Sequence, residues 1–491
     1  MSGQHIRQKF SSLWLEPWLF YSLLIVNLLP IWSARYFPSQ DGVGHVENAV
    51  ILRHWLGPSG DFYRQYYRIN PFPEPNWLGH VMLMFLTAIL SPRNSLKAIL
   101  SIFILAFPSA LRYAAGGIRR GGEAAAYLAL PFIYGLPLQK GNLNFCFGFV
   151  LFFVVVGFWI RHRDRLGAAV VAAFIGLTLL LYFSHIVSLI MAIMVIGCVE
   201  IGFAIRDRSL AKSRIIKAAI AFAPAVVLTA AFFLSRGSGQ VDRLSPKVLI
   251  EQLIQLQALL SYSQAEAHLA IAVACIFAVA VIFTIARMRG GLIIYDSLAA
   301  AVIVALVLYF LVPNSAAGGG LISFRLAMFV YFVLMLWLAA RPIRWAPIGI
   351  AALIAISMGF VALNYRTAAR VSAYVTDFTS IAPHVRRGST LLPVLASWKE
   401  YSPNGRPFTY RIRPMLLAAG YVAAERGVID LGNYEASQGY FPLLWKDPNH
   451  PPLADYIVVW RTGPIDKDSR LIPMQSLIET KYQLAFISRH G

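Results

Sequence analysis

The chain has 491 residues, of which 58% are hydrophobic and only 13% are charged, and its formal net charge is +20. This composition excludes an ordinary soluble globular protein, and the long apolar runs between residues 14 and 363 predict a polytopic, all-α membrane protein. The basic residues lie in short clusters between the apolar runs, which indicates membrane topology and argues against a nucleic-acid partner.

We expect eleven spans in the lipid bilayer, the first being a retained helix and not a cleaved signal peptide. The loops assigned to the cytoplasm carry basic clusters such as Arg161, Arg163 and Arg165, whereas Lys140 is the only basic residue in the short outer turns. By the positive-inside rule, this places the amino terminus in the cytoplasm and the protein in the cytoplasmic (inner) membrane. The spans are predicted near residues 14–34, 96–115, 122–138, 143–160, 166–183, 186–205, 215–235, 267–286, 291–311, 321–340 and 345–363.

Two longer outer regions, residues 35–92 and 236–268, interrupt the transmembrane module of residues 1–363. The first contains the apolar stretch 76–90, which is too short for a span and is expected to lie on the membrane or dip into it. In the second, leucines at helical spacing between 249 and 260 predict an amphipathic helix, either interfacial or packed within the protein.

From residue 364 onward the composition shifts to charges, prolines and short apolar runs. The segments "STLLPVLAS", "ADYIVVWR" and "YQLAFIS" are typical of strands, and "PMLLAAGYVAAERG" predicts a helix that ends at Gly427. We therefore expect residues 364–491 to form a small α/β domain, and an odd number of spans places it on the extracytoplasmic, or periplasmic, side.

Several ionisable groups fall on the expected outer side, where they must face water, a partner or a substrate. The first group is Asp41, His45 and Glu47 in "SQDGVGHVENA". A carboxylate here could act as a general base, with His45 one helical turn away on the same face. The alternative is that Asp41 merely caps a helix.

The motif "QKGNLNFCFG" places Lys140, Asn142 and Asn144 at the mouth of a span, where they could bind a sugar or phosphate. Helix capping by the asparagines is the alternative. His185 lies in a short turn between two apolar runs, where it could contact a substrate or only pack between helices.

Arg325 follows the glycines of "NSAAGGG" at the outer end of a span and is suited to clamp a phosphate, unless its side chain only extends to the interface. In the loop "DFYRQYYRINPFPEPNW", the neighbours Tyr67 and Arg68 suit a sugar platform, with an interfacial aromatic belt as the alternative. His80 follows this loop and is added as a candidate substrate-binding residue.

The sequence contains neither a P-loop nor a dinucleotide-binding glycine motif. An enzyme at the outer face therefore needs a substrate that is already in the membrane. A lipid-linked donor meets this requirement with the fewest assumptions.

Together, these features resemble the GT-C superfamily of integral membrane glycosyltransferases, which includes protein mannosyltransferases and lipid A aminoarabinose transferases. The resemblance depends on the acidic motif "SQDGVGHVENA" after the first span, the interfacial segment "PNWLGHVMLMFLTAIL", the many spans and the outer carboxy-terminal domain. It implies transfer of a sugar from a polyprenyl-phosphate donor to a glycan, lipid or protein acceptor. Inversion at the anomeric carbon is the implied stereochemistry.

The resemblance implies that Asp41 is the general base and that Lys140 and Arg325 stabilise the leaving phosphate, while His45, His185 and Asn144 position the substrates. Many members carry two neighbouring acids, but here Gln40 and Gly42 flank Asp41. We therefore predict no metal site, although Asp41 and His45 could still share a divalent cation such as Mg²⁺ or Mn²⁺.

Two other functions fit a chain of this kind. One is an O-antigen ligase or polymerase type of transferase, which would place its main outer loop between late helices. The other is a transporter or flippase of lipid-linked glycans, which would place charges at mid-membrane and often contain inverted repeats. In the carboxy-terminal part, Asn433, Tyr434 and Glu435 could touch an acceptor, but a structural turn is the favoured interpretation.

Overall fold

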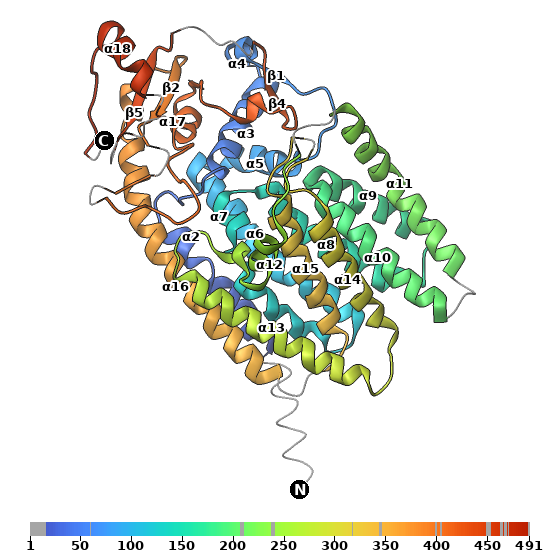
Figure 1. The fold of residues 1–491 in the computed structure, drawn as a ribbon. Coiled ribbons are helices and arrows are strands. Elements are labelled where there is room, and N and C mark those ends of the chain that lie inside the picture. Colours follow the sequence, from blue (N-terminus) through green and yellow to red (C-terminus); the bar gives the residue numbers. More distant parts are fainter. Residues whose placement is uncertain are drawn as a thin grey trace.

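The computed structural model describes residues 16–489, apart from residues 59, 207–210, 237–240, 317, 343–345, 398–399, 403–404, 448–452, 462–464, 466–468 and 470. Within this part the chain is mostly helical, and a small sheet region lies near the carboxyl terminus (Figure 1). The amino-terminal segment 1–13, which was expected in the cytoplasm, lies outside the described residues.

In the described part of the chain, eight helical segments are long and apolar enough to cross a membrane. This confirms a multi-pass helical protein, and each of the eight matches one of the expected spans. They are α6 (Pro92–Ile118), α8 (Leu143–His162), α10 (Ile186–Arg206), α11 (Ala211–Ser235), α13 (Glu266–Met288), η3 with α14 (Ile294–Asp296 and Ser297–Leu311), α15 (Ile322–Ala339) and α16 (Ala346–Thr379) with the following η4 (Ala382–His384).

The other three expected spans take different forms. The first is helical over residues 16–26, turns at residues 27–28 and resumes as α2 (Leu29–Ser33). The segment expected at 122–138 forms the 3-10 helix η1 (Gly122–Phe132) and the short α7 (Leu136–Lys140), and α9 (Ala168–Ser184) has only 17 residues. Prolines account for the interruptions in the first two, because proline lacks the N–H that a continuous helix needs.

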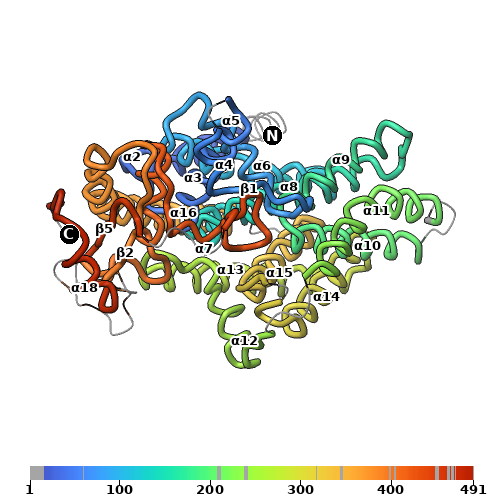
Figure 2. The backbone as a smooth tube through the Cα atoms, turned by 90° about the horizontal axis from the view of Figure 1, so that it is seen from above, coloured from blue at the N-terminus to red at the C-terminus, as the bar shows by residue number. Residues whose placement is uncertain are grey.

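The centre of the helical part is built around α8 and α15, whose apolar stretches are 78% and 83% buried. Their phenylalanines interlock, with ring centroids 4.7 Å apart for Phe149 and Phe332 and 5.1 Å apart for Phe152 and Phe329. By contrast, the stretches in α11, α13 and α14 are each only 28% buried, as expected for helices that face lipid. Seen from above, α9 and α11 lie at the opposite end of the molecule from β2, β5 and α18 (Figure 2).

The first outer region forms α3 (Gly42–Leu56), α4 (Asp61–Tyr66), β1 (Tyr67–Ile69) and α5 (Leu78–Ile89). With 12 residues, α5 is too short to span a bilayer, and it packs on α3 (Figure 1). In the second outer region, the amphipathic helix predicted over 249–260 is wrong in its second half. There, α12 (Pro246–Ile254) ends early because Leu256 has a left-handed backbone (φ 48°), and η2 (Gln257–Leu259) follows.

The carboxy-terminal sheet places β2 (Thr390–Leu395) between β3 (Ile429–Asp430) and β5 (Tyr456–Trp460), all parallel. The helix α17 (Ala419–Arg426) ends as predicted at Gly427, whose φ is +67°. The strand predicted from "YQLAFIS" is wrong, since residues 482–488 are mostly exposed and belong to no strand in the described structure. The remaining elements of this part are η5 (Glu435–Ser437), β4 (Leu443–Trp445) and α18 (Leu471–Lys481).

Two features join the carboxy-terminal part to the membrane helices. The helix α16 runs past the expected domain boundary at residue 363 without a break and ends at Thr379. The strand β4 pairs antiparallel with β1 of the first outer region, with Tyr67 opposite Trp445. Segments far apart in the sequence therefore meet at one end of the molecule (Figure 1).

Candidate active site

A cavity of about 450 Å³ lies where residues 41–76, the ends of several helices and residues 434–441 meet. Seven of the sequence-predicted site residues line it, although they come from four separate segments of the chain. These seven are Asp41, His45, Lys140, Asn142, Asn144, His185 and Arg325. The other four predicted site residues, Glu47, Tyr67, Arg68 and His80, are not among its lining residues.

Asp41 occupies the N-cap position of α3 but makes no side-chain capping bond. Its Oδ1 instead accepts a 2.9 Å hydrogen bond from Nε2 of Gln40. Burial raises the pKa of the Asp41 carboxyl above its usual value, while the charge of Lys140 acts in the opposite direction. The carboxylate therefore has few hydrogen bonds among the described residues, and its raised pKa favours its acting as a proton acceptor.

Lys140 reaches the site because the turn after α7 lies against the start of α3. The backbone N–H of Asp41 donates to the carbonyl of Lys140 at 2.7 Å. Gly141 makes this approach possible, because its φ is +86° and a Cβ atom there would collide with the backbone nitrogen of Gly42.

Arg325 supplies the second basic group of the cavity, from the first turn of α15. Its guanidinium lies 5.5 Å from the ring centre of Phe145, and its buried Nε has no hydrogen-bond partner in the described part of the chain. The pKa of Tyr440 is affected by both Arg325 and Asp41. Burial raises the pKa of its phenol, while Arg325 lowers it and Asp41 raises it further. An anionic ligand in the cavity would satisfy the donor that Arg325 leaves unused.

The two asparagines differ in what they do. Asn142 is the N-cap residue of α8 but makes no side-chain capping bond, so its amide is available to the cavity. Asn144 accepts a 2.6 Å hydrogen bond from the backbone N–H of Gly79, which fixes the start of α5 against α8. Capping therefore does not account for Asn142, whereas Asn144 has a structural contact as well as a place on the cavity wall.

His185 separates α9 from α10 and contacts the ring of Phe145 with a centroid distance of 4.7 Å. Its Nδ1 accepts a hydrogen bond of 3.2 Å from the backbone N–H of Val187. In the neutral ring the proton therefore belongs to Nε2, which makes His185 a hydrogen-bond donor at the cavity.

One wall of the cavity is apolar and comes from α10 and α11. It includes Ile190 and Phe233, which are also 40% and 47% exposed at the protein surface. These helices are among those that could span the membrane. The cavity thus joins a polar interior to an apolar surface that can contact lipid.

His80 lies beside the cavity lining. It forms a buried cluster with His45 and Glu435, and its Nε2 is 2.8 Å from Oε2 of Glu435. Burial alone would raise the pKa of Glu435, but the two histidines hold it down at about 2. His80 is therefore placed behind His45 and is not among the residues that line the cavity.

Glu47 does not share the site with Asp41, although both belong to the same short motif. It faces the carboxy-terminal helix α17, where Gly420 leaves room for its carboxyl group. Burial raises the pKa of Glu47 well above its usual value, and the neighbouring Asp430 and Glu435 raise it further. The structure therefore separates Glu47 from Asp41, because six residues along a helix place the two side chains on different faces.

Tyr67 and Arg68 also lie elsewhere. Tyr67 is buried and stacks on Trp445 with ring centres 4.5 Å apart, and Arg68 is exposed in the middle of β1. These residues hold the first outer region to the carboxy-terminal part instead of lining the cavity. The sequence could not show this, because the pairing of β1 with β4 joins segments that are far apart in the chain.

The carboxy-terminal segment contributes more to the site than the favoured structural-turn interpretation implied. Tyr434, Tyr440 and Phe441 line the cavity, and Glu435 contacts His45 directly behind it. Asn433 has the structural role, since it exchanges hydrogen bonds with Asn48 of α3. The only signal in the sequence was the density of aromatic and polar side chains between residues 433 and 441.

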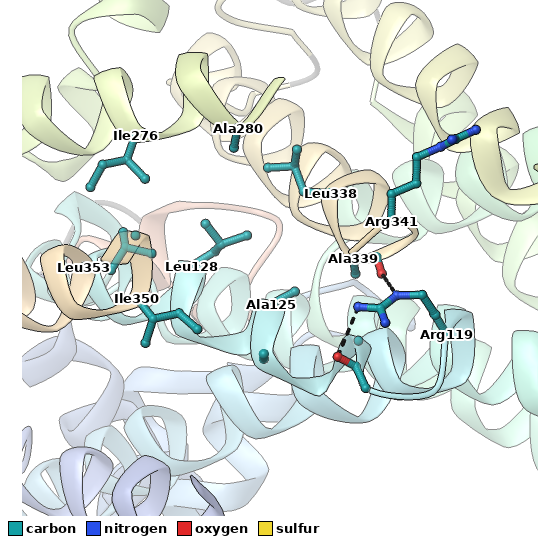
Figure 3. A pocket seen from close by; sticks show the side chains of 14 residues that line it. Arg119, Ala125, Leu128, Ile276, Ala280, Leu338, Ala339, Arg341, Ile350 and Leu353 are labelled. Carbon is teal, nitrogen blue, oxygen red and sulfur yellow. Dashed lines mark hydrogen bonds between the residues drawn. The ribbon is translucent and has the colours of Figure 1, made fainter. Parts of the chain in front are cut away.

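A smaller cavity of about 90 Å³ lies at the other end of α15, between η1, α13 and α16 (Figure 3). Arg119, one of its two arginines, donates to the carbonyl oxygens of Ala339 and Gly121. Arg341 points away from the apolar lining and pairs with Asp296. Both guanidinium groups are already bonded to the protein, so this cavity has fewer polar groups available to a ligand than the 450 Å³ cavity.

Comparison with known proteins gave no matching family model and no significantly similar curated protein.

Proposed function

We propose that this protein is a GT-C-type membrane glycosyltransferase that transfers a sugar from a polyprenyl-phosphate donor to an acceptor hydroxyl at the outer face of the cytoplasmic membrane. One observation carries the proposal. A single cavity combines a lightly bonded carboxylate, two basic side chains and an apolar wall exposed at the helical surface. A polyprenyl-phosphate sugar matches each of these features. Its reacting carbon belongs beside the carboxylate, its phosphate beside the basic side chains, and its lipid chain along the apolar wall.

In the proposed reaction, Asp41 removes the proton of the acceptor hydroxyl, and that oxygen attacks the anomeric carbon of the sugar. The bond from this carbon to the phosphate oxygen breaks, and its electron pair leaves with the polyprenyl phosphate. Lys140 and Arg325 stabilise the charge that develops on the phosphate. The raised pKa of Asp41 supports its role, because a base is most effective when its pKa approaches the working pH.

The position of the lining residues suggests where each substrate binds. We assign the lipid chain of the donor to the wall formed by Ile190 and Phe233. The acceptor approaches from the carboxy-terminal side, where Tyr434 and Tyr440 line the cavity. We also propose the eleven-span topology, in which the first helix, the η1–α7 segment and α9 are the remaining three spans.

The deciding experiment is sugar transfer by the full-length protein in liposomes, with a panel of polyprenyl-phosphate sugars and release of polyprenyl phosphate as the readout. We expect Asp41→Asn to lower the rate by roughly 10²-fold or more, as for loss of a general base. Asp61→Asn is the matched control, because Asp61 is an exposed acid of the same region that pairs with Arg64 at the surface. Unchanged transfer by Asp41→Asn, with wild-type thermal stability, would exclude the proposed base.

The same liposomes separate the other two functions. Transfer from a polyprenyl-linked oligosaccharide, but not from any monosaccharide donor, would indicate an O-antigen ligase or polymerase type of enzyme. Movement of a labelled lipid-linked glycan between leaflets, without release of the lipid carrier, would indicate a transporter.

A further inference from the structure

Three side chains from three separate elements meet in a fully enclosed cluster beside the cavity. They are His45 of α3, His80 of α5 and Glu435 of η5. Nδ1 of His45 lies 2.8 Å from Oε1 of Glu435, Nε2 of His80 lies 2.8 Å from Oε2, and the two nitrogens are 3.3 Å apart. His80 and Glu435 are 0% exposed, and His45 is 4% exposed.

One ring nitrogen of each histidine faces Glu435, and the other faces away from it. Nδ1 of His80 lies 3.0 Å from the carbonyl oxygen of Asn76, so this nitrogen must carry a hydrogen. In His45, Nδ1 faces Glu435, so Nε2 points away from the carboxylate. A neutral His80 therefore directs the lone pair of Nε2 toward the carboxylate, and a neutral His45 does the same with Nδ1 when its proton is on Nε2.

Two lone pairs and a carboxylate repel each other unless a cation or protons lie between them. Protonation of the histidines would offset part of this repulsion, but Oε1 of Glu435 is a buried atom without a well-formed hydrogen bond despite its 2.8 Å contact with His45. A metal ion would satisfy all three groups at once. A backbone carbonyl that orients the far side of the imidazole, as that of Asn76 does for His80, is also typical of metal-binding histidines.

We propose that His45, His80 and Glu435 bind a first-row transition metal ion, with Zn²⁺ as the best match. Two imidazoles and one carboxylate are a known zinc ligand set, whereas Mg²⁺ prefers sites made of oxygen ligands alone. This site differs from the Asp41–His45 pair considered from the sequence, since Asp41 is not one of the three ligands. Because ion binding is measured without any donor sugar, the proposal does not depend on the proposed function.

The site would have two effects on the protein. It joins the first outer region to the carboxy-terminal part, because α3 and α5 supply two ligands and η5 supplies the third. It also places the ion next to the cavity, since His45 lines that cavity as well. Three protein ligands leave a coordination position that a water molecule or a substrate oxygen can take.

The test uses full-length protein carrying an affinity tag without histidine, purified without chelators and equilibrated with Zn²⁺. Metal content after dialysis and the unfolding temperature with and without EDTA are the two readouts. We expect about one ion per chain and a fall in the unfolding temperature when EDTA removes it. In His80→Asn and Glu435→Gln, the affinity for Zn²⁺ should fall by at least about 10-fold.

His54→Asn is the matched control, because His54 lies in the same helix α3 but its Nδ1 bonds to the carbonyl oxygen of Val50, away from the cluster. This variant should retain the ion and the response to EDTA. If Glu435→Gln does not fold, His80→Asn alone decides the outcome. The proposal is overturned if wild-type protein retains no ion and gains no thermal stability from Zn²⁺, or if both ligand variants bind Zn²⁺ as the wild type does.

Discussion

The backbone N–H of Asp41 donates a 2.7 Å hydrogen bond to the carbonyl oxygen of Lys140. This contact joins the start of α3 to the end of α7 and places a carboxylate and an ammonium group in one cavity. Because the bond is between backbone atoms, it fixes the two chain segments and leaves both side chains for a ligand. The proposed base and one of the proposed phosphate ligands therefore depend on a single close approach of two turns.

Gly141→Ala should disrupt this approach. The added Cβ atom would meet the backbone nitrogen of Gly42, and the φ of +86° is unfavourable for alanine by at least about 1 kcal/mol. We expect a lower unfolding temperature and at least about 10-fold slower sugar transfer, because small misplacements of reacting groups are costly.

Gly388→Ala is the control for Gly141→Ala, because Gly388 also has a positive φ of 71° but a Cβ atom there would meet nothing within 4 Å. Its cost should be limited to backbone strain, with transfer unchanged. Equal activity losses in the two variants would show that the contact between Gly141 and Gly42 is unimportant.

Lys140→Gln should change the pH dependence of transfer as well as its rate. The charge of Lys140 lowers the pKa of Asp41, whereas burial raises it. Without Lys140 the pKa of Asp41 rises further, so the acidic limb of kcat/KM should move to higher pH. The check is a pH profile of wild type and variant beside Lys247→Gln, which alters an exposed lysine of the second outer region. If the acidic side of the kcat/KM profile does not move, the group that titrates there is not Asp41.

Arg325→Gln should lower kcat for sugar transfer by roughly 10²-fold, as does the loss of other charge-stabilising donors in active sites. The physical reason is that the buried Nε of Arg325, which has no hydrogen-bond partner among the described residues, is available to the phosphate as its negative charge develops. Arg387→Gln serves as the control, since Arg387 is an exposed arginine of the carboxy-terminal part. Wild-type kcat in Arg325→Gln would remove the arginine from the reaction.

Glu47→Gln should retain transfer activity and alter only stability. The folded-state pKa of Glu47 lies well above 4.5, so the folded protein holds this proton more tightly than the unfolded chain. The contribution of Glu47 to stability is therefore greatest at low pH and falls as pH rises above about 4.5, by about 1.4 kcal/mol per unit of pKa difference.

Glutamine does not titrate, so the unfolding temperature of Glu47→Gln relative to wild type should increase from pH 5 to pH 8. Thermal unfolding in detergent at the two pH values measures this difference, and a transfer assay accompanies it. A loss of activity similar to that of Asp41→Asn would return Glu47 to the catalytic group.

The sequence by itself determined the membrane class and the helices that carry it. Eight of the expected spans were identified because a helix needs about 20 apolar residues to cross a bilayer, and these residues follow one another in the sequence. The end of α17 at Gly427 was likewise local, because glycine readily adopts the left-handed backbone that ends a helix. Outer-end residues such as Asn142, His185 and Arg325 were found for the same reason, since polar groups are conspicuous beside apolar runs.

Only the tertiary structure decided which of these groups meet. Glu47 is six residues from Asp41 yet contacts α17, whereas Glu435, far along the chain, contacts His45 at 2.8 Å. Tyr67 appeared to belong to a sugar platform, but the pairing of β1 with β4 buries it against Trp445. Such contacts depend on packing between segments that are distant in the chain, and the local sequence pattern does not predict that packing.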